Sequence, residues 1–354
     1  MTSEAGPVTG NGSNALMLSI DVMGSDGGVA VTIEAVRLFL ARDADVRLLL
    51  FGDLAAMRQA IGDSPLPADR VELCHAEQVV TMEDSAAVAL RNKKRSSMRL
   101  AIEAVKDGRA QACVSAGNTG ALMAVSRFVL KTVAGIDRPA IAAMIPALGG
   151  HTLMLDLGAN VDSSADHLYQ FATMGAILAQ AIDGPSQPDD WRPKVALLNI
   201  GSEDIKGNEQ VKRAVPLLQG STLNYTGFVE GHEIYTDRVD VVVCDGFVGN
   251  VSLKTSEGVA RMVSHYLREE FTRSWWNKLV GVVARPILMS FRSRIDPRQY
   301  NGASLLGLRG VVVKSHGGAD AVAFANAIRL ARLAAGNRVP EMIARQLGAA
   351  LDAA

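Results

Sequence analysis

The sequence predicts a three-layer α/β/α fold built around a mostly parallel sheet. Along most of the 354 residues, short apolar runs alternate with segments of helical periodicity. Strand–helix alternation of this kind places parallel strands between two layers of helices. Hydrophobic residues make up 48% of the chain and aromatic residues only 5%. We therefore expect the helices to be packed on the sheet through a largely aliphatic core.

The expected elements follow one another in a regular order. The first apolar run, residues 16–22, precedes a helical pattern at 33–40, and most later runs end in a glycine-rich polar turn. Residues 140–146 and 152–157 flank Leu-Gly-Gly and predict a hairpin. Further strands are expected at 46–51, 71–74, 112–115, 194–200, 239–244 and 310–315, and further helices at 85–106 and 121–133.

The chain is expected to form one large domain over residues 15–354, with a flexible tail at 1–14 and a projecting amphipathic helical segment at 265–295. The tail lacks the basic and apolar regions of a signal peptide. No stretch offers the roughly 20 apolar residues that a membrane-spanning helix needs. These features predict a cytoplasmic protein.

Composition excludes several classes of function. Thirty-six basic residues balance 37 acidic ones, giving a net charge of -1, so no overall field attracts a nucleic acid backbone. The three cysteines, Cys74, Cys113 and Cys244, lie far apart in or beside apolar runs. Their spacing excludes a disulfide framework and a cysteine zinc site. We expect no metal, no cofactor and no nucleic acid partner.

Six of the expected strands end in a turn that combines glycine with small polar or charged residues. Ligands of open α/β sheets bind beyond the carboxyl ends of the strands, where helix N-termini present free N–H groups. Six such turns on one edge favour a site for an anion such as phosphate, although each turn alone is usually only a turn. The residues are Asp21 and Gly24; Gly117, Asn118, Thr119 and Gly120; Asp156, Gly158 and Asn160; Asn199, Gly201 and Glu203; Asp245, Gly246, Gly249 and Asn250; and Lys314, His316 and Gly317.

These turns carry a resemblance to a known family, in order and from about residue 16 to 335. The chain resembles the bacterial acyl-ACP:phosphate acyltransferases of phospholipid synthesis. It departs from their usual pattern at Val22, Ser25 and His232. The motifs that match are Asp21-Val-Met-Gly-Ser-Asp, Ser115-Ala-Gly-Asn-Thr-Gly, Leu155-Asp-Leu-Gly-Ala-Asn, Asn199-Ile-Gly-Ser-Glu, Cys244-Asp-Gly-Phe-Val-Gly-Asn and Lys314-Ser-His-Gly-Gly.

The resemblance implies transfer of a long fatty acyl chain from acyl carrier protein to inorganic phosphate. The acyl phosphate product would serve the membrane enzyme that acylates glycerol 3-phosphate. The resemblance also implies a fold like that of phosphotransacetylases and isopropylmalate dehydrogenases, and a homodimer.

Three residues are expected to carry the chemistry of this reaction. Lys314 offers a cation for phosphate beside a permissive glycine turn. His316 is the candidate for polarising the thioester carbonyl or protonating the leaving thiol, against a purely structural role. Asn160 supplies an amide, although Asp156 and Asn160 also fit an Asx-turn that ends the strand. Thr119 is the alternative N-cap of its helix.

Three alternative functions stay open. A metal- and NAD-dependent dehydrogenase on the same fold would use Asp237, Asp240 and Asp245 for a divalent metal, but no Gly-x-Gly-x-x-Gly follows the first strand. A short-chain phosphotransacetylase is a nearer alternative. A membrane scaffold without enzyme activity is the third.

A basic cluster occupies the middle of the helix expected at 85–106. Lys93, Lys94 and Arg95 belong to Arg-Asn-Lys-Lys-Arg at 91–95. The cluster is either a solvated helix face or the contact that steers an acidic carrier protein to the site.

Residues 271–294 form a strongly amphipathic segment. Trp275, Trp276, Leu279, Val280 and Val283 fall on one half of a helical wheel, with cations on the other half. Aromatic and aliphatic side chains bordered by cations suit a helix that lies in the interface of an anionic membrane. A core helix and a dimer contact are the alternatives.

Overall fold

The computed structural model describes residues 15–203, 205–294 and 296–352, so the predicted tail at 1–14 lies outside the described residues. Eleven strands form a single sheet in the order β3-β2-β1-β4-β11-β10-β5-β6-β9-β7-β8. The strands are β1 Leu16–Asp21, β2 Val46–Gly52, β3 Val71–His75, β4 Ala112–Ser115, β5 Ala140–Ala147, β6 Gly150–Leu155, β7 Lys194–Leu198, β8 Asn224–Val229, β9 Val241–Val243, β10 Ala303–Leu306 and β11 Val311–Lys314.

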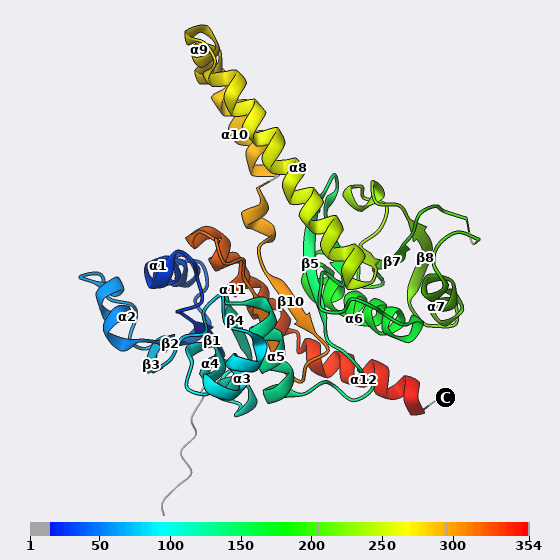
Figure 1. Cartoon of the computed structure of the whole chain (residues 1–354), viewed down its shortest axis with the longest axis horizontal. Coiled ribbons are helices and arrows are strands. Elements are labelled where there is room, and N and C mark those ends of the chain that lie inside the picture. Colours follow the sequence, from blue (N-terminus) through cyan, green and yellow to red (C-terminus); the bar gives the residue numbers. More distant parts are fainter. Residues whose placement is uncertain (1–14, 204, 295, 353–354) are drawn as a thin grey trace, which may run out of the picture.

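Helices cover both faces of this sheet (Figure 1). Their bounds are α1 Gly28–Leu40, α2 Leu54–Ile61, α3 Ala86–Asn92, α4 Ser97–Lys106, α5 Thr119–Leu130, α6 Ala165–Asp183, α7 Glu209–Gln219, α8 Gly246–Thr272, α9 Trp275–Val283, α10 Arg285–Arg294, α11 Ala321–Gly336 and α12 Val339–Asp352. Short 3-10 turns occupy Gly184–Ser186, Glu233–Tyr235 and Pro297–Tyr300.

Side chains of successive strand residues enter two separate cores, as a pleated strand requires. On β2, Leu48 and Leu50 pack with α1, α6 and α11 on one face. Leu49 and Phe51 pack with α4 and α5 on the other. Both cores are dominated by Ala, Val, Leu and Ile. The predicted three-layer α/β/α fold with an aliphatic core is confirmed.

The strands run in two opposing groups. β1, β2, β3, β4 and β11 are parallel to one another, and β6, β7, β8 and β9 are parallel to one another. Between them, the pairings β11–β10, β10–β5 and β5–β6 are all antiparallel. Three successive reversals make the second group antiparallel to the first. The expectation that all six strand-end turns share one edge is therefore wrong.

The local elements depart from the sequence predictions at a few places. The helix expected at 85–106 is two helices, because the Ser96 side chain caps α4 by accepting from the Arg99 N–H at 3.4 Å. β8 and β10 were not predicted. β10 has only four residues, and Gly227 interrupts β8 with a φ of +94°, so neither gives a strong apolar signal.

An arm formed by α8, α9 and α10 projects from the body, with α9 at its tip and α10 beside α8 (Figure 1). Only Gly246 and Gly249 of the 27 residues of α8 are buried. The projection thus includes the described part of the segment predicted at 265–295 and extends back to the start of α8. Among the described residues, no helix is both long and apolar enough to span a membrane.

Candidate active site

The ends of β1, β4 and β11 bring three predicted or motif residues into one row. Asp21 is paired in register with Ser115, and Ser115 with Lys314. These strands are adjacent and parallel, so their polar end residues lie at the same edge of the sheet. The side chains gathered here are the first candidate for an anion and acyl transfer site.

Asp21 is the buried carboxyl of this row. The Ser115 hydroxyl donates to its Oδ2 at 2.6 Å, and Ser115 Oγ in turn accepts the N–H of Gly117 at 3.1 Å. Burial raises the pKa of Asp21, while hydrogen bonds and the charge of Lys314 oppose that rise. A Cβ on Gly24 would lie 2.5 Å from the Gly117 nitrogen. Glycine at 24 therefore allows the first loop to lie directly against the Gly117 turn.

Lys314 is half-buried, and its ammonium group points toward the turn after β4. Its Nζ donates to the carbonyl of Ala116 at 3.0 Å and to the carbonyl of Ser315. Burial lowers its pKa to about 8, against the opposing charges of Asp26 and Asp21. The ammonium thus retains its charge at neutral pH and keeps a third donor position for an anion.

His316 follows on the exposed side of the same turn. Its Nδ1 accepts the N–H of Gly318 at 3.1 Å. An acceptor Nδ1 leaves the proton of the neutral ring on Nε2. His316 therefore presents an Nε2–H donor, which is the group needed to stabilise an oxyanion; as a neutral ring it does not protonate a leaving thiolate.

Asn301 positions this turn, and the sequence analysis missed it. Its Oδ1 accepts the His316 N–H at 3.1 Å, and its Nδ2 donates to Ser315 Oγ at 2.9 Å. Asp26 was missed as well: its N–H donates to the carbonyl of Gly317 at 3.0 Å. The available signals were Asn301 before Gly302, a typical turn pair, and the second acidic residue of the first loop.

Asn118 has a structural duty at the start of α5. Its Oδ1 accepts the N–H of Ala121 at 2.9 Å, which makes Asn118, and not Thr119, the N-cap. Its Nδ2 donates to the carbonyl of Met82 at 2.7 Å. The side chain of Asn118 thus joins the loop before α3 to the α5 N-terminus. The backbone of Thr119 and Gly120 forms the first turn of that helix, beside Lys314's partner Ala116.

The Asp156 turn after β6 forms a second, closed cluster. Asp156 is fully buried, and its Oδ1 accepts the N–H groups of Ile141 and Ala159, each at 3.0 Å. Its Oδ2 accepts both the backbone N–H and the Nδ2 of Asn160 at 2.8 Å. Asn160 Nδ2 also donates to the carbonyl of Pro139 at 3.0 Å. The amide protons of Asn160 are thus already used within the protein, which favours the Asx-turn alternative for this pair.

The first turn of α8 packs against this cluster. A Cβ on Gly249 would lie 1.8 Å from the Asp156 carbonyl, and one on Gly246 would lie 2.2 Å from the Asn160 carbonyl. Asn250 faces Gly158, whose φ is +114°. Asp245 caps the helix by accepting from Phe247 and Val248. These glycines serve close helix packing.

The remaining predicted residues on this half form local contacts. Asn199 Nδ2 donates to the carbonyl of Lys206 at 3.3 Å, and Glu203 pairs with Lys206 at 3.0 Å. A Cβ on Gly201 would lie 2.5 Å from the Cδ atom of the Lys206 side chain. Asp240, one of the three carboxylates of the dehydrogenase alternative, accepts the N–H of Lys194. In the part of the chain that the structure describes, no three metal-ligating side chains come together.

Helix α8 is the base of the arm. It starts after β9 and runs past β5 out of the body (Figure 1). Lys254, two turns into α8, lies close enough to Lys314 for its charge to contribute to the lowered pKa of Lys314. Lys254 itself pairs with Glu257 at 3.0 Å. Lys254 is thus a second cation whose charge acts on Lys314.

The predicted carrier-contact residues differ in availability. Lys93 pairs with Asp84 at 2.9 Å and donates to the carbonyl of Val79. Arg95 pairs with Glu77 at 2.8 Å on the surface. Lys94 is exposed. Lys93 thus holds the loop before α3, Arg95 is engaged in a surface ion pair, and Lys94 faces solvent.

All five predicted membrane-contact residues are exposed on α9. Trp275 and Trp276 stack with ring centroids 3.9 Å apart, and their exposed fractions are 66% and 59%. Leu279, Val280 and Val283 are 49–75% exposed. The alternative of a core helix is therefore excluded for this chain.

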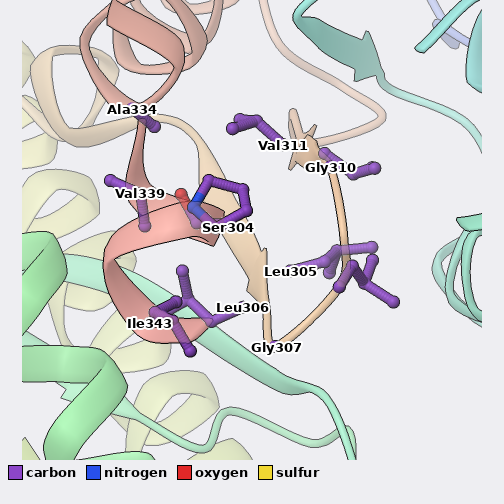
Figure 2. Close-up of a pocket in the computed structure, with 12 residues that line it drawn as sticks. Ser304, Leu305, Leu306, Gly307, Gly310, Val311, Ala334, Val339 and Ile343 are labelled. Carbon is purple, nitrogen blue, oxygen red and sulfur yellow. The ribbon is translucent and has the colours of Figure 1, made fainter. Parts of the chain in front are cut away.

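One small hollow of the body lies away from both clusters. It is lined mainly by β10, β11, α11 and α12, including Ser304, Leu306, Val339 and Ile343 (Figure 2). Its volume of about 10 Å³ holds at most about one water molecule. This void is a packing feature of the core, too small for a substrate.

The arrangement of the sheet matches that of solved structures of two kinds of enzyme. A phosphotransacetylase from Streptococcus pyogenes superposes with a TM-score of 0.59, at 16% identity, over 91% of this chain and 94% of its own. A 4-hydroxythreonine-4-phosphate dehydrogenase from Klebsiella pneumoniae gives a TM-score of 0.51, at 13% identity, over 91% and 98% of the two chains. The fold is therefore that of the α/β/α enzymes represented by the phosphotransacetylases.

Comparison with related sequences identifies the family to which the chain belongs. The family model described as "Fatty acid synthesis protein" matches residues 16–342, and the chain belongs to this family. A phosphate acyltransferase from Alkalilimnicola ehrlichii is 54% identical, covering 96% of this chain and 98% of its own. Another from Alcanivorax borkumensis is 56% identical, covering 94% and 97%. The chain is accordingly an acyltransferase, as the motifs of its strand-end turns predicted.

Proposed function

We propose that this acyltransferase moves a long-chain fatty acyl group from acyl carrier protein to inorganic phosphate, which releases the carrier thiol and forms acyl phosphate. The names of the relatives support phosphate as acceptor. The observation that carries the proposal is the Lys314 ammonium, held half-buried beside the Gly117 turn and the α5 N-terminus. A cation, a helix N-terminus and a glycine turn together suit a small oxyanion.

In the proposed reaction, phosphate is the nucleophile. One of its oxygens attacks the thioester carbonyl, so no covalent acyl-enzyme is needed, and none of the turns forms a Gly-x-Ser-x-Gly elbow. Lys314 holds the phosphate and neutralises part of its charge. His316 donates a hydrogen bond from Nε2 to the carbonyl oxygen as negative charge develops there. As the carbon–sulfur bond breaks, the leaving sulfur takes the proton that HPO4²⁻ brings, so monohydrogen phosphate and thioester become acyl phosphate and free thiol. Gly117 and Thr119 provide close backbone approach.

The decisive assay is phosphate-dependent release of free thiol from long-chain acyl carrier protein. We expect thiol and acyl phosphate to appear in equal amounts, with no requirement for a nicotinamide or a metal. Acetyl-CoA in the same assay tests the short-chain phosphotransacetylase alternative. Turnover of acetyl-CoA in preference to the long-chain donor, or turnover without phosphate, contradicts the proposal.

We further propose that the protein is cytoplasmic and attaches reversibly to the anionic inner face of the cell membrane through α9. The exposed Trp275 and Trp276 at the tip of the arm support this attachment, and Lys278 and Arg285 lie beside them to meet anionic head groups. Acyl phosphate is amphiphilic, so release next to the membrane acyltransferase that acylates glycerol 3-phosphate limits its loss to water.

The membrane proposal is tested with the double variant Trp276→Glu/Val280→Glu. It should no longer sediment with anionic vesicles while it keeps full activity on soluble acyl carrier protein. Leu217→Glu/Val322→Glu is the matched control, because these apolar residues are also exposed but lie outside the arm. Vesicle binding that persists in the α9 variant overturns the assignment.

We also propose a homodimer in which α8 of each arm packs against its copy. Val259, Met262 and Tyr266 recur at helical spacing along α8 and are 51–59% exposed in the single chain. Replacement of Met262 and Tyr266 by Glu should halve the mass measured by light scattering, and an unchanged mass contradicts this interface.

A further inference from the structure

One exposed aromatic ring on the body is bordered by cations. Phe128, in the last turn of α5, is 55% exposed. The guanidinium carbon of Arg99 lies 5.5 Å from its ring centroid, and the Lys131 ammonium lies 4.9 Å from it. Cations at such distances are attracted to the ring face. The contacts hold two positive charges over a large apolar side chain that remains open to solvent.

Further cations surround this ring. Arg99 reaches α3 by donating to the carbonyl of Leu90 at 3.4 Å, and the exposed Arg91 follows directly. Arg127 is exposed next to Phe128. The nearby carboxylate is Glu103, which pairs with Arg99 at 2.8 Å. We call the surface formed by Arg91, Lys94, Arg99, Arg127, Phe128 and Lys131 the Phe128 surface.

The local charge contrasts with the chain as a whole. The six residues of the Phe128 surface include five cations, of which Arg99 pairs with Glu103, whereas the full chain has a net charge of -1. An excess of one sign around an apolar anchor is the pattern of a surface that recognises an oppositely charged protein.

The Phe128 surface and the candidate site lie at opposite ends of helix α5. Helix α5 begins at Asn118, within that site, and Phe128 follows ten residues later, about 15 Å along the helix axis. Helix α3 likewise begins beside the Asp84 carbonyl that Asn118 contacts at 3.3 Å. A protein bound at the Phe128 surface thus lies one helix length from Lys314 and His316.

We propose that the Phe128 surface is the docking site for the acidic face of the acyl carrier protein. This inference rests on the proposed function, because it names where the donor of that reaction binds. Phe128 is the apolar anchor, and Arg91, Arg127 and Lys131 pair with acidic side chains of the carrier. The carrier's flexible prosthetic arm then delivers the thioester along α5 to the site.

A membrane is a poor match for the same surface. The tip of the arm at α9 and the α3–α5 layer lie at opposite ends of the molecule (Figure 1). A flat bilayer that contacts α9 therefore does not reach α5. The Phe128 surface stays free for a soluble partner while the arm is at the membrane.

The test compares Arg127→Glu/Lys131→Glu with the matched control Lys212→Glu/Arg213→Glu. Both variants replace one Arg and one Lys and change the net charge equally, but the control lies on α7, in the other half of the sheet. We expect the Kd for acyl carrier protein to rise at least tenfold only in the first variant. Phe128→Ala should weaken binding similarly without any change of charge.

A small donor separates docking from chemistry. With acyl-pantetheine as thioester and phosphate as acceptor, the Phe128-surface variants should keep the wild-type rate, and their melting temperatures should match that of the control. An unchanged Kd for the carrier overturns the docking site, while wild-type protein that forms no acyl phosphate from either donor overturns the proposed function instead. Loss of vesicle sedimentation with an unchanged carrier Kd would assign the surface to the membrane and also overturn the inference.

Discussion

Two strand-end turns of this protein have a similar make-up of glycine and polar residues and do different work. The Asp156 turn and the Lys314 turn each follow a sheet strand, contain glycine and include a polar side chain of the kind used in catalysis. Four donors converge on the Asp156 carboxylate, and the amide protons of Asn160 are used as well. In the Lys314 turn, the ammonium and the Nε2–H of His316 keep donors that can reach a ligand.

The difference teaches that residue type at a strand end does not separate structure from chemistry. What separates them is the number of hydrogen bonds that each group already makes inside the protein. A buried carboxylate whose oxygens all accept hydrogen bonds within the protein stabilises the fold. A donor that faces solvent and makes no hydrogen bond within the protein is available to substrate. Substitutions in the two turns should therefore have opposite signatures.

The largest effect is expected for Asp156→Ala. Four buried donors lose their acceptor, and each unpaired buried group costs about 1–3 kcal/mol, so the free energy of unfolding should fall by at least about 4 kcal/mol. Denaturant unfolding followed by circular dichroism measures this loss. A variant that unfolds at the wild-type midpoint but has lost activity would place Asp156 among the catalytic groups.

His316→Gln should reduce the rate of acyl transfer about 10²–10³-fold, because loss of a positioned oxyanion donor has an effect of this order. The melting temperature should remain near that of wild type, since His316 is exposed. His75→Gln, at another exposed histidine, is the control. Equal activity of the two variants would contradict the role of His316.

Lys314→Met should raise the phosphate KM tenfold or more, since a charge-assisted contact contributes about 1.5–3 kcal/mol. Stability should be unchanged or higher. Burial lowers the pKa of Lys314 from 10.5 to about 8, so the fold disfavours the charged lysine and methionine relieves that cost. Steady-state kinetics at varied phosphate measure the KM, and a thermal melt measures the stability of the variant. An unaltered phosphate KM with a lower melting temperature would show that Lys314 stabilises the fold and does not bind phosphate.

The smallest effect concerns pH. Because the pKa of Lys314 is about 8, its ammonium is mostly lost at pH 9, and the wild-type phosphate KM should rise about tenfold between pH 7 and pH 9. Lys314→Arg should abolish this rise, since arginine keeps its charge. The unfolded chain binds more protons than the folded one between pH 8 and 10.5, so the Lys314 contribution to stability should increase with pH in that window. A KM that is flat with pH in wild type contradicts the pKa assignment.

The sequence predicted the fold and the composition of the Lys314 turn but not how the turns are divided between edges. Strand positions such as Ala112–Ser115 follow from apolar runs and glycine turns, which are local signals. The direction of β6, β7 and β9 depends on β10, a four-residue strand contributed by residues that follow the arm. That pairing is non-local, so no pattern near Asp156 indicates that its turn faces the other edge.

Within the site, Lys314 and His316 were predictable because they stand together in one short motif. Asn301 was not, because it lies outside that motif, 15 residues before His316. Exposure was also invisible in the sequence: the helical wheel of 271–294 fits a core helix, a dimer contact or a membrane contact equally, and only the structure shows that Trp275 and Trp276 are uncovered.

The packing of Gly246 and Gly249 against the Asp156 turn gives α8 a fixed pivot, and the helix beyond it is a lever. At 1.5 Å per residue, Thr272 lies about 39 Å from Gly246 and Lys254 about 12 Å from it. A rigid tilt that displaces the outer end by about 3 Å therefore moves Lys254 by about 1 Å relative to Lys314. A displacement at the outer end of α8 thus moves the charge of Lys254 by about one third as much relative to the row formed by Asp21, Ser115 and Lys314.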